Sequence, residues 1–134
     1  MLLFSKSIFP NARLTSGLPR RIKARTLQAY QKGEGFFAWD WLTLETESGL
    51  SRRKARNSQW EKWSEISKLF QWVHLPQNEW ADIRKQNRDW MLRATHAAHL
   101  YAFSRISRIL PEVRLVTFDE EQRALATKND FRLI

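Results

Sequence analysis

Residues 51–75, SRRKARNSQWEKWSEISKLFQWVHL, decide the fold that we predict from the sequence. Leu50 and Ser51 have the form of a hydrophobic staple followed by an N-cap, and Pro76 stops a helix from continuing. After the first turns, apolar residues recur at steps of three and four and so share one helical stripe, formed by Trp60, Trp63, Ile66, Phe70 and Val73. We therefore predict a single helix over 51–75, with its second half packed against a core.

The first turns of this predicted helix carry four cations: Arg52, Arg53, Lys54 and Arg56. The N-terminus of a helix already has a partial positive charge, so cations placed there have a small electrostatic cost. Two interpretations follow. Either the four side chains are simply solvated, or an anion binds at the helix start.

A second long helix is predicted over about 78–110, with Asn78 as its N-cap and Pro111 as its stop. Unbroken, it would be about 50 Å long, which exceeds the need of a compact domain of this size. We therefore expect a kink, or another chain covering its apolar second half. The small residues Ala94, Ala97 and Ala98 are interpreted as packing residues.

Two shorter segments complete the predicted fold. Segment 34–51 fits either a helix or a strand, and we favour a helix because no partner strand is evident. The stretch VRLVTF (113–118) predicts a short strand, followed by a helix that Asp119 and Gln122 open as a capping-box pair. The carboxyl-terminal residues Phe131, Leu133 and Ile134 are expected to dock on the core. The predicted fold class is all-α: a small helical bundle of two long helices with a short strand and helix as its tail.

The amino-terminal quarter of the chain is basic. Residues 1–33 contain seven Lys or Arg and no acid, which is typical of a mitochondrial transit peptide or of a basic arm. We favour the arm, and predict that 1–17 is a basic arm (or targeting segment) and 18–134 a single helical domain. The first residues, MLLFSKSIF, also suit association with a membrane surface.

Composition limits the classes of function. A formal net charge of +9 over 134 residues favours an acidic partner such as nucleic acid. The absence of cysteine excludes disulfides, thiol catalysis and cysteine-ligated metals. It also fits a reducing compartment, so we predict a cytoplasmic protein, with the mitochondrial matrix as the alternative. No stretch approaches the 18 or so apolar residues of a transmembrane helix.

Catalytic and metal-binding patterns are weak. His96 and His99 are three residues apart, a spacing that can present two metal ligands, but further ligands are missing nearby. Acids mostly alternate with bases at helical spacing, which indicates surface ion pairs and not a pair of catalytic carboxylates. We predict no enzymatic activity, no cofactor and no metal.

One short stretch resembles a known DNA-binding family. The step Ser48-Gly49-Leu50-Ser51 followed by RRKAR is similar to the turn and recognition-helix start of helix-turn-helix proteins. The chain departs from that pattern at Glu45, where a small residue is usual, and at Ala55 and Ser58, where larger apolar residues are usual.

Nucleic-acid binding is the function that the sequence predicts best. Lys and Arg at a helix start, together with free backbone N–H groups, suit contacts to phosphate. The predicted contact residues form two clusters, namely Arg20, Arg21, Lys23 and Arg25, and Arg52, Arg53, Lys54 and Arg56. We predict a small basic accessory protein that binds RNA or DNA as a subunit of a nucleoprotein assembly, with other protein subunits or copies of itself as further partners. The alternative is a structural subunit of a larger protein complex that docks through aromatic helix faces.

Overall fold

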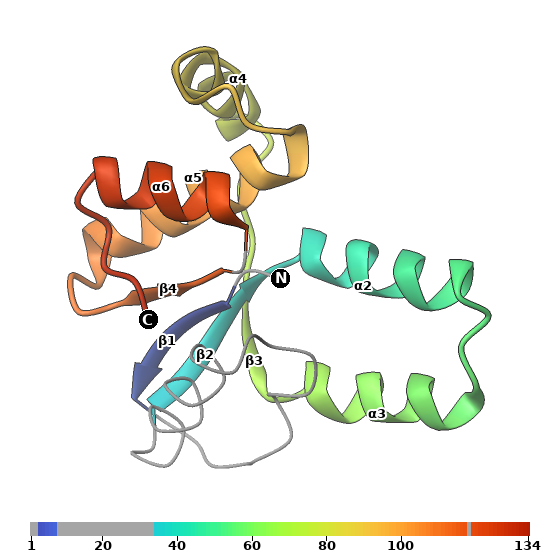
Figure 1. The fold of residues 1–134 in the computed structure, drawn as a ribbon. Coiled ribbons are helices and arrows are strands. Elements are labelled where there is room, and N and C mark those ends of the chain that lie inside the picture. The colour runs from blue at the N-terminus through green and yellow to red at the C-terminus, as the bar shows by residue number, and fades with distance from the viewer. Residues whose placement is uncertain (1–2, 8–33, 118) are drawn as a thin grey trace.

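The computed structural model describes residues 3–7, 34–117 and 119–134 as a mixed α/β fold (Figure 1). The elements in chain order are β1 (Leu3–Ser7), β2 (Glu34–Trp39), α2 (Trp41–Arg52), α3 (Asn57–Ser67), β3 (Phe70–Val73), α4 (Glu79–Trp90), α5 (Ala94–Ile109), β4 (Arg114–Val116) and α6 (Glu120–Lys128). The predicted all-α bundle is therefore wrong, because strands from both ends and from the middle of the chain join in one sheet.

The sheet has the strand order β3-β2-β1-β4. β1 is antiparallel to both of its neighbours, with Phe4 opposite Phe37 on β2 and opposite Leu115 on β4. β2 and β3 are parallel, with Phe36 opposite Phe70. Because the backbone of β1 is bonded on both sides, the start of the chain lies in the middle of the sheet. This position does not fit the hypothesis that the first residues lie on a membrane surface.

β2 replaces the helix that we favoured for the start of segment 34–51. Phe36, Ala38 and Trp39 are almost completely buried and Phe37 is half-buried, so both faces of the strand are covered. A strand buried on both faces is a continuous apolar run without alternation, which periodicity does not distinguish from a helix. The partner strands of β2 come from residues 3–7 and 70–73. From the sequence, we predicted that the first segment belongs to a basic arm and the second to a helix.

The predicted helix over 51–75 is also wrong. Residues 51 and 52 end α2, the chain turns at 53–56, and α3 occupies only Asn57–Ser67. Phe70–Val73 is a strand whose partner is β2. The predicted apolar stripe extended past the end of α3 into β3, because the spacing of Phe70 and Val73 suits one face of a helix as well as a buried strand. Gly49 lies inside α2, so the helix-turn-helix resemblance is not supported by the fold.

The predicted helix over 78–110 divides into α4 and α5, which confirms the expected kink. Met91 between them has φ 54°, in the left-handed region that ends helices. The amide of Asn87 fixes this break, since its Oδ1 accepts from Leu92 N–H at 3.0 Å and its Nδ2 donates to Leu92 O at 2.9 Å.

α5 is the central helix of the core. Its buried residues are Ala97, Ala98, His99, Leu100, Tyr101, Ala102, Phe103, Ser104 and Ile106. The prediction that Ala97 and Ala98 are packing residues is confirmed, while Ala94 at the start of the helix is exposed. α4 is attached to α5 by Glu79, whose carboxylate accepts from the Tyr101 hydroxyl and lies 3.0 Å from Arg105 Nη2.

In the carboxyl-terminal tail, β4 forms within the predicted VRLVTF strand and pairs with β1 of the same chain, a partner that the sequence did not indicate. The Asp119 carboxylate accepts from Gln122 N–H at 2.8 Å and so caps α6, as the capping pair indicated. Ile134 is buried, and Phe131 packs edge-on against Phe103.

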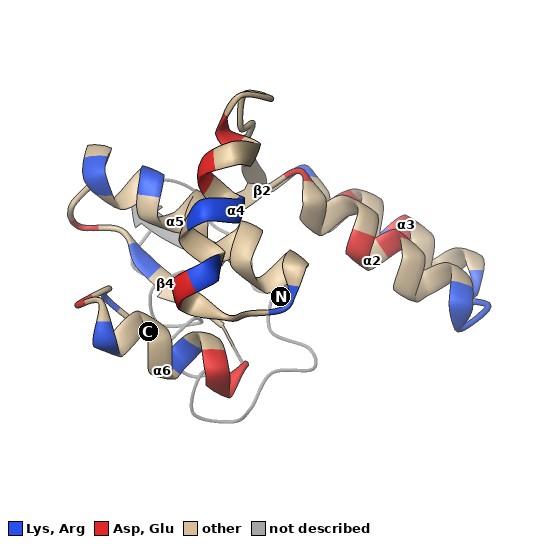
Figure 2. Cartoon of the chain, turned by 90° about the horizontal axis from the view of Figure 1, so that it is seen from above, with Lys and Arg blue, Asp and Glu red and all other residues tan. Residues whose placement is uncertain are grey.

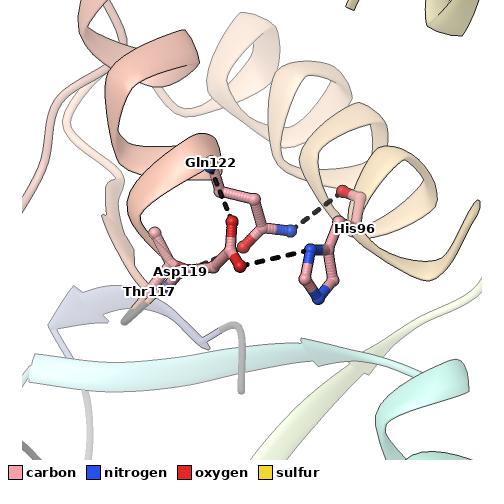
Figure 3. Close-up of polar contacts among 4 residues, drawn as sticks. All are labelled: His96, Thr117, Asp119 and Gln122. Atoms are coloured by element: carbon pink, nitrogen blue, oxygen red, sulfur yellow. Dashed lines mark hydrogen bonds and ion pairs between the residues drawn. The ribbon is translucent and has the colours of Figure 1, made fainter. Parts of the chain in front are cut away.

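A buried polar network joins α6, β4 and α5 (Figure 3). Gln122, only 2% exposed, accepts from the Thr117 hydroxyl at 2.6 Å and donates to His96 O at 3.0 Å. Asp119 Oδ2 lies 3.4 Å from His96 Nδ1, an ion-pair distance without hydrogen-bond geometry. Gln122 therefore satisfies polar groups on two other elements of the fold.

No helix in the described part of the chain combines the length and the apolar character needed to cross a bilayer.

Candidate nucleic-acid interface

α2 and α3 form a helical hairpin (residues 41–67) that stands away from the sheet (Figure 1). It is the crossover between the parallel strands β2 and β3. Its base joins the core through Leu42, which is 2% exposed, whereas α3 contains no fully buried residue. The hairpin is thus anchored at one end and open to solvent at the other.

Four predicted contact residues lie together at the free end, which we call the tip (residues 52–56). Figure 2 shows Lys and Arg gathered there, at the turn between the two helices. Arg52, Arg53, Lys54 and Arg56 are all exposed. No acidic residue occurs between Glu47 and Glu61, so the positive charge of the tip is not neutralised within the turn.

The tip differs from the prediction in its relation to the helix dipoles. Arg52 ends α2, and Arg53 and Lys54 follow it directly, so these cations lie at a helix C-terminus and not at an N-terminus. The partial charge of a helix C-terminus is negative and stabilises nearby cations. The electrostatic cost predicted for a basic helix start is therefore absent for these three residues.

The backbone of the tip closes α2 with a Schellman motif. Ala55 N–H donates to Leu50 O and Lys54 N–H donates to Ser51 O, each at 3.0 Å. Lys54 occupies the left-handed position of the motif, with φ 50°, where glycine is the favoured residue. A lysine at this position keeps a charge at the expense of backbone strain, and residues held in this way are frequent at functional sites.

α3 begins at the other side of the turn. Arg56 is its N-cap, and the Gln59 side chain accepts from Arg56 N–H at 2.9 Å. Gln59 N–H donates to Arg56 O at 2.9 Å, so within the described part of the chain the N–H groups of Asn57 and Ser58 are those left as donors to an anion. The tip therefore offers both cationic side chains and backbone donors on one exposed turn.

Glu45 and His99 hold the base of the hairpin against α5. His99 Nε2 donates to Glu45 Oε2 at 2.6 Å, and the His99 side chain is 3% exposed. The hydrogen bond from His99 lowers the pKa of the Glu45 carboxyl, against the opposing effect of partial burial. In the described part of the chain, His99 Nδ1 has no hydrogen-bond partner although it is buried.

Tryptophans extend this base. The ring centroids of Trp39, Trp41 and Trp80 are 5.7–5.8 Å from one another, and the Trp39 ring meets His99 edge-on at 5.6 Å. Trp80 is 37% exposed and Trp39 is 4% exposed. Trp39 is therefore a core residue, and Trp80 lies at the edge of this cluster with part of its ring in solvent.

Sequence reasoning missed the role of Glu45 and His99. Segment 34–51 was interpreted as a helix or a strand without a site residue in it, and nothing in residue spacing links 45 to 99. His96 and His99 share α5 but have different partners, Asp119 and Glu45. Among the described residues, no group of three or more potential ligands lies close enough to hold a metal ion.

The second predicted cluster, Arg20, Arg21, Lys23 and Arg25, lies outside the described residues. Its role stays a prediction.

No known protein family, curated protein or solved structure matches this chain.

Proposed function

We propose that this chain is a small, basic, non-catalytic protein that binds the phosphate backbone of RNA or DNA at the tip of its helical hairpin. It would act as a subunit of a nucleoprotein assembly, in the cytoplasm or, as the alternative, in the mitochondrial matrix. The observation that supports the proposal is the tip itself, with four exposed cations at 52–56 on an element that stands clear of the fold.

Three properties of the tip favour phosphate over other anions in solution. Arg side chains offer a planar set of donors that matches phosphate oxygens, and three of the four cations are Arg. The turn adds backbone donors at the start of α3. The tip also projects far enough for a nucleic acid to reach it without contacting the sheet, since α2 is 12 residues, or about 18 Å, long. Contacts of this kind carry little sequence specificity.

The strained Lys54 supports the same conclusion. A glycine at this position of the Schellman motif would remove the steric cost of φ 50°. The chain has Lys at this position although the backbone conformation disfavours a side chain. We infer that the charge of Lys54 serves binding.

The test is a salt titration of binding to short single- and double-stranded RNA and DNA. Arg52, Arg53, Lys54 and Arg56 are all changed to Gln, and the affinity is measured at several salt concentrations. If each cation neutralises one phosphate, the slope of log K against log salt falls by about 3 to 4 units, because fewer counterions are released on binding.

A matched variant separates a local effect from an effect of net charge. Arg84, Lys85, Arg88 and Arg108 are exposed on α4 and α5, and changing all four to Gln removes the same charge elsewhere. The proposal requires this variant to keep most of the slope. Equal losses in both variants, or no binding by the wild type above background, would contradict it. A third variant with Gln at 20, 21, 23 and 25 measures the contribution of the other predicted cluster.

The alternative function, a structural subunit that docks through aromatic or apolar faces, also has an observation in its favour. Leu44 on α2 is 59% exposed, and the aromatic residues of α3 are only half-buried. A protein contact made by this side of the hairpin would resist salt, whereas phosphate contacts weaken steeply. Capture of a partner protein that survives 0.5 M salt and is lost on Leu44→Asp would favour the alternative.

A further inference from the structure

A hollow of about 300 Å³ opens between the α4–α5 bend and α6. The bend contributes Trp90, Met91 and Leu92, and α6 contributes Glu121, Ala124, Leu125 and Lys128. The hollow is mostly apolar and has one charge of each sign. Figure 1 shows the helical hairpin extending from the side of the molecule opposite to α6. The hollow, which α6 and the α4–α5 bend line, is therefore separate from the proposed phosphate site.

Met91 is displayed at the edge of the hollow. Its side chain is 84% exposed and its backbone is in the left-handed conformation, with φ 54°. The two hydrogen bonds between the Asn87 side-chain amide and the Leu92 backbone, one donated and one accepted by Asn87, hold the bend in this shape. Contact surfaces often have a large apolar side chain that a strained turn holds in solvent. Methionine is well suited to this role, because its flexible side chain adapts to the surface of a partner.

The face of α6 that lines the hollow has charges that would complement those of the same face on a second copy of the chain. Glu121, Ala124, Leu125 and Lys128 follow the i, i+3, i+4, i+7 spacing of one helical face. Glu121 and Lys128 are two turns, or about 10 Å, apart, with the small Ala124 between them. Neither charge takes part in an ion pair within the described part of the chain. A twofold axis near Ala124 would place each Glu121 opposite Lys128 of the second copy, and the reverse.

We propose that this surface is a self-association site, at which α6 packs antiparallel against α6 of a second copy of the chain. Two Glu121–Lys128 pairs then flank a contact of Ala124 and Leu125. Met91 of each copy covers the apolar hollow of the other. The charges set the antiparallel register, and burial of Met91 and of the partly exposed Leu125 supplies the attraction. The proposal does not depend on nucleic-acid binding.

The test is analytical ultracentrifugation of the full chain over a range of concentrations. Glu121→Lys alone, or Lys128→Glu alone, makes both cross-pairs like-charged, so each should weaken the dimer about tenfold or more. The double variant E121K/K128E restores opposite charges in both pairs and should return the dissociation constant to within about threefold of the wild type. Met91→Ser should weaken dimerisation without changing the charge.

Two controls complete the experiment. Glu61→Lys makes the same charge change on the exposed face of α3 and should leave the dimer unaffected. Circular dichroism of each variant shows whether a loss of dimer reflects unfolding. A protein that stays monomeric at all concentrations would overturn the proposal, and so would a dimer that ignores these substitutions or a double variant that fails to recover. Because the hairpin tip is unchanged in every variant, phosphate binding is measured separately on the same samples.

Discussion

The carboxylate of Glu45 on α2 lies 2.6 Å from the buried Nε2 of His99 on α5. This contact joins residues 54 positions apart in the chain and connects the base of the helical hairpin to the central helix. The direction in which the tip projects therefore depends on a pair of side chains remote from the tip.

The Glu45–His99 pair predicts a pH dependence of stability. The folded pKa of Glu45 lies below its ordinary value of 4.5, so the folded state favours the charged form. The sign follows from linkage: this contribution is fully present above pH 4.5 and is lost as the pH falls through the lowered folded pKa. Urea unfolding of wild type and Glu45→Gln should give a difference in free energy that is constant near neutral pH and shrinks in acid.

Glu61→Gln on the exposed face of α3 is the control for this experiment, and it should show little difference at any pH. A difference between wild type and Glu45→Gln that stays constant down to pH 3 would contradict the assignment.

Tyr101→Phe tests the attachment of α4 to α5. Burial raises the pKa of Tyr101 to about 12, and its hydrogen bond to the Glu79 carboxylate acts in the same direction. Loss of a hydrogen bond to a charged group should reduce the free energy of unfolding by about 1.5–3 kcal/mol at neutral pH. In the wild type, this contribution is present below pH 10 and declines between about pH 10 and 12, as the unfolded tyrosine ionises first. If the free energy of unfolding of wild type and variant changes in the same way between about pH 10 and 12, Tyr101 is not the group responsible for the decline.

Gln122→Leu tests the buried network of Figure 3. The substitution removes the acceptor of the Thr117 hydroxyl proton and a donor to the His96 carbonyl, and both groups lie in or near the core. Unsatisfied buried polar groups should destabilise the protein by about 1–3 kcal/mol, measured by urea unfolding. Gln77→Leu, in the exposed turn before α4, makes the same chemical change and should alter stability by less than about 0.5 kcal/mol. Similar effects of the two substitutions would contradict the role of Gln122.

Lys54→Gly should have opposite effects on stability and binding. Relief of the left-handed strain, less the greater chain entropy of glycine when unfolded, should stabilise the fold by roughly 0.5–1 kcal/mol. The same change removes one cation and should reduce the salt slope of nucleic-acid binding by about one unit. Lys54→Gln is the matched control, because it removes the charge without the backbone gain. If Lys54→Gly binds as tightly as the wild type, Lys54 makes no phosphate contact.

The elements predicted well are those whose signals are local. A kink was one of two alternatives drawn from the excessive length of an unbroken helix, although its position at Met91 was not predicted. The α6 cap was expected because Asp119 and Gln122 interact across a single turn. The cations of the tip are neighbours in sequence, so their clustering holds in any fold. We did not predict their position at the end of α2. Glycine usually marks the left-handed residue that ends a helix, whereas this chain has Lys54 there.

By itself, the sequence determined the basic charge, the clustering of the tip cations, the apolar faces of α4 and α5 and the structure of the carboxyl-terminal tail. The existence and strand order of the sheet follow only from the tertiary structure. A buried strand such as Phe36–Trp39 forms because it pairs with strands more than 25 residues away on either side in the sequence. The tertiary structure also decided the Glu45–His99 contact and the pairing of the α4–α5 bend with α6. The physical reason is common to all three: local patterns report the periodicity of one segment, whereas burial and hydrogen bonding between distant segments depend on which surfaces the folded chain brings together.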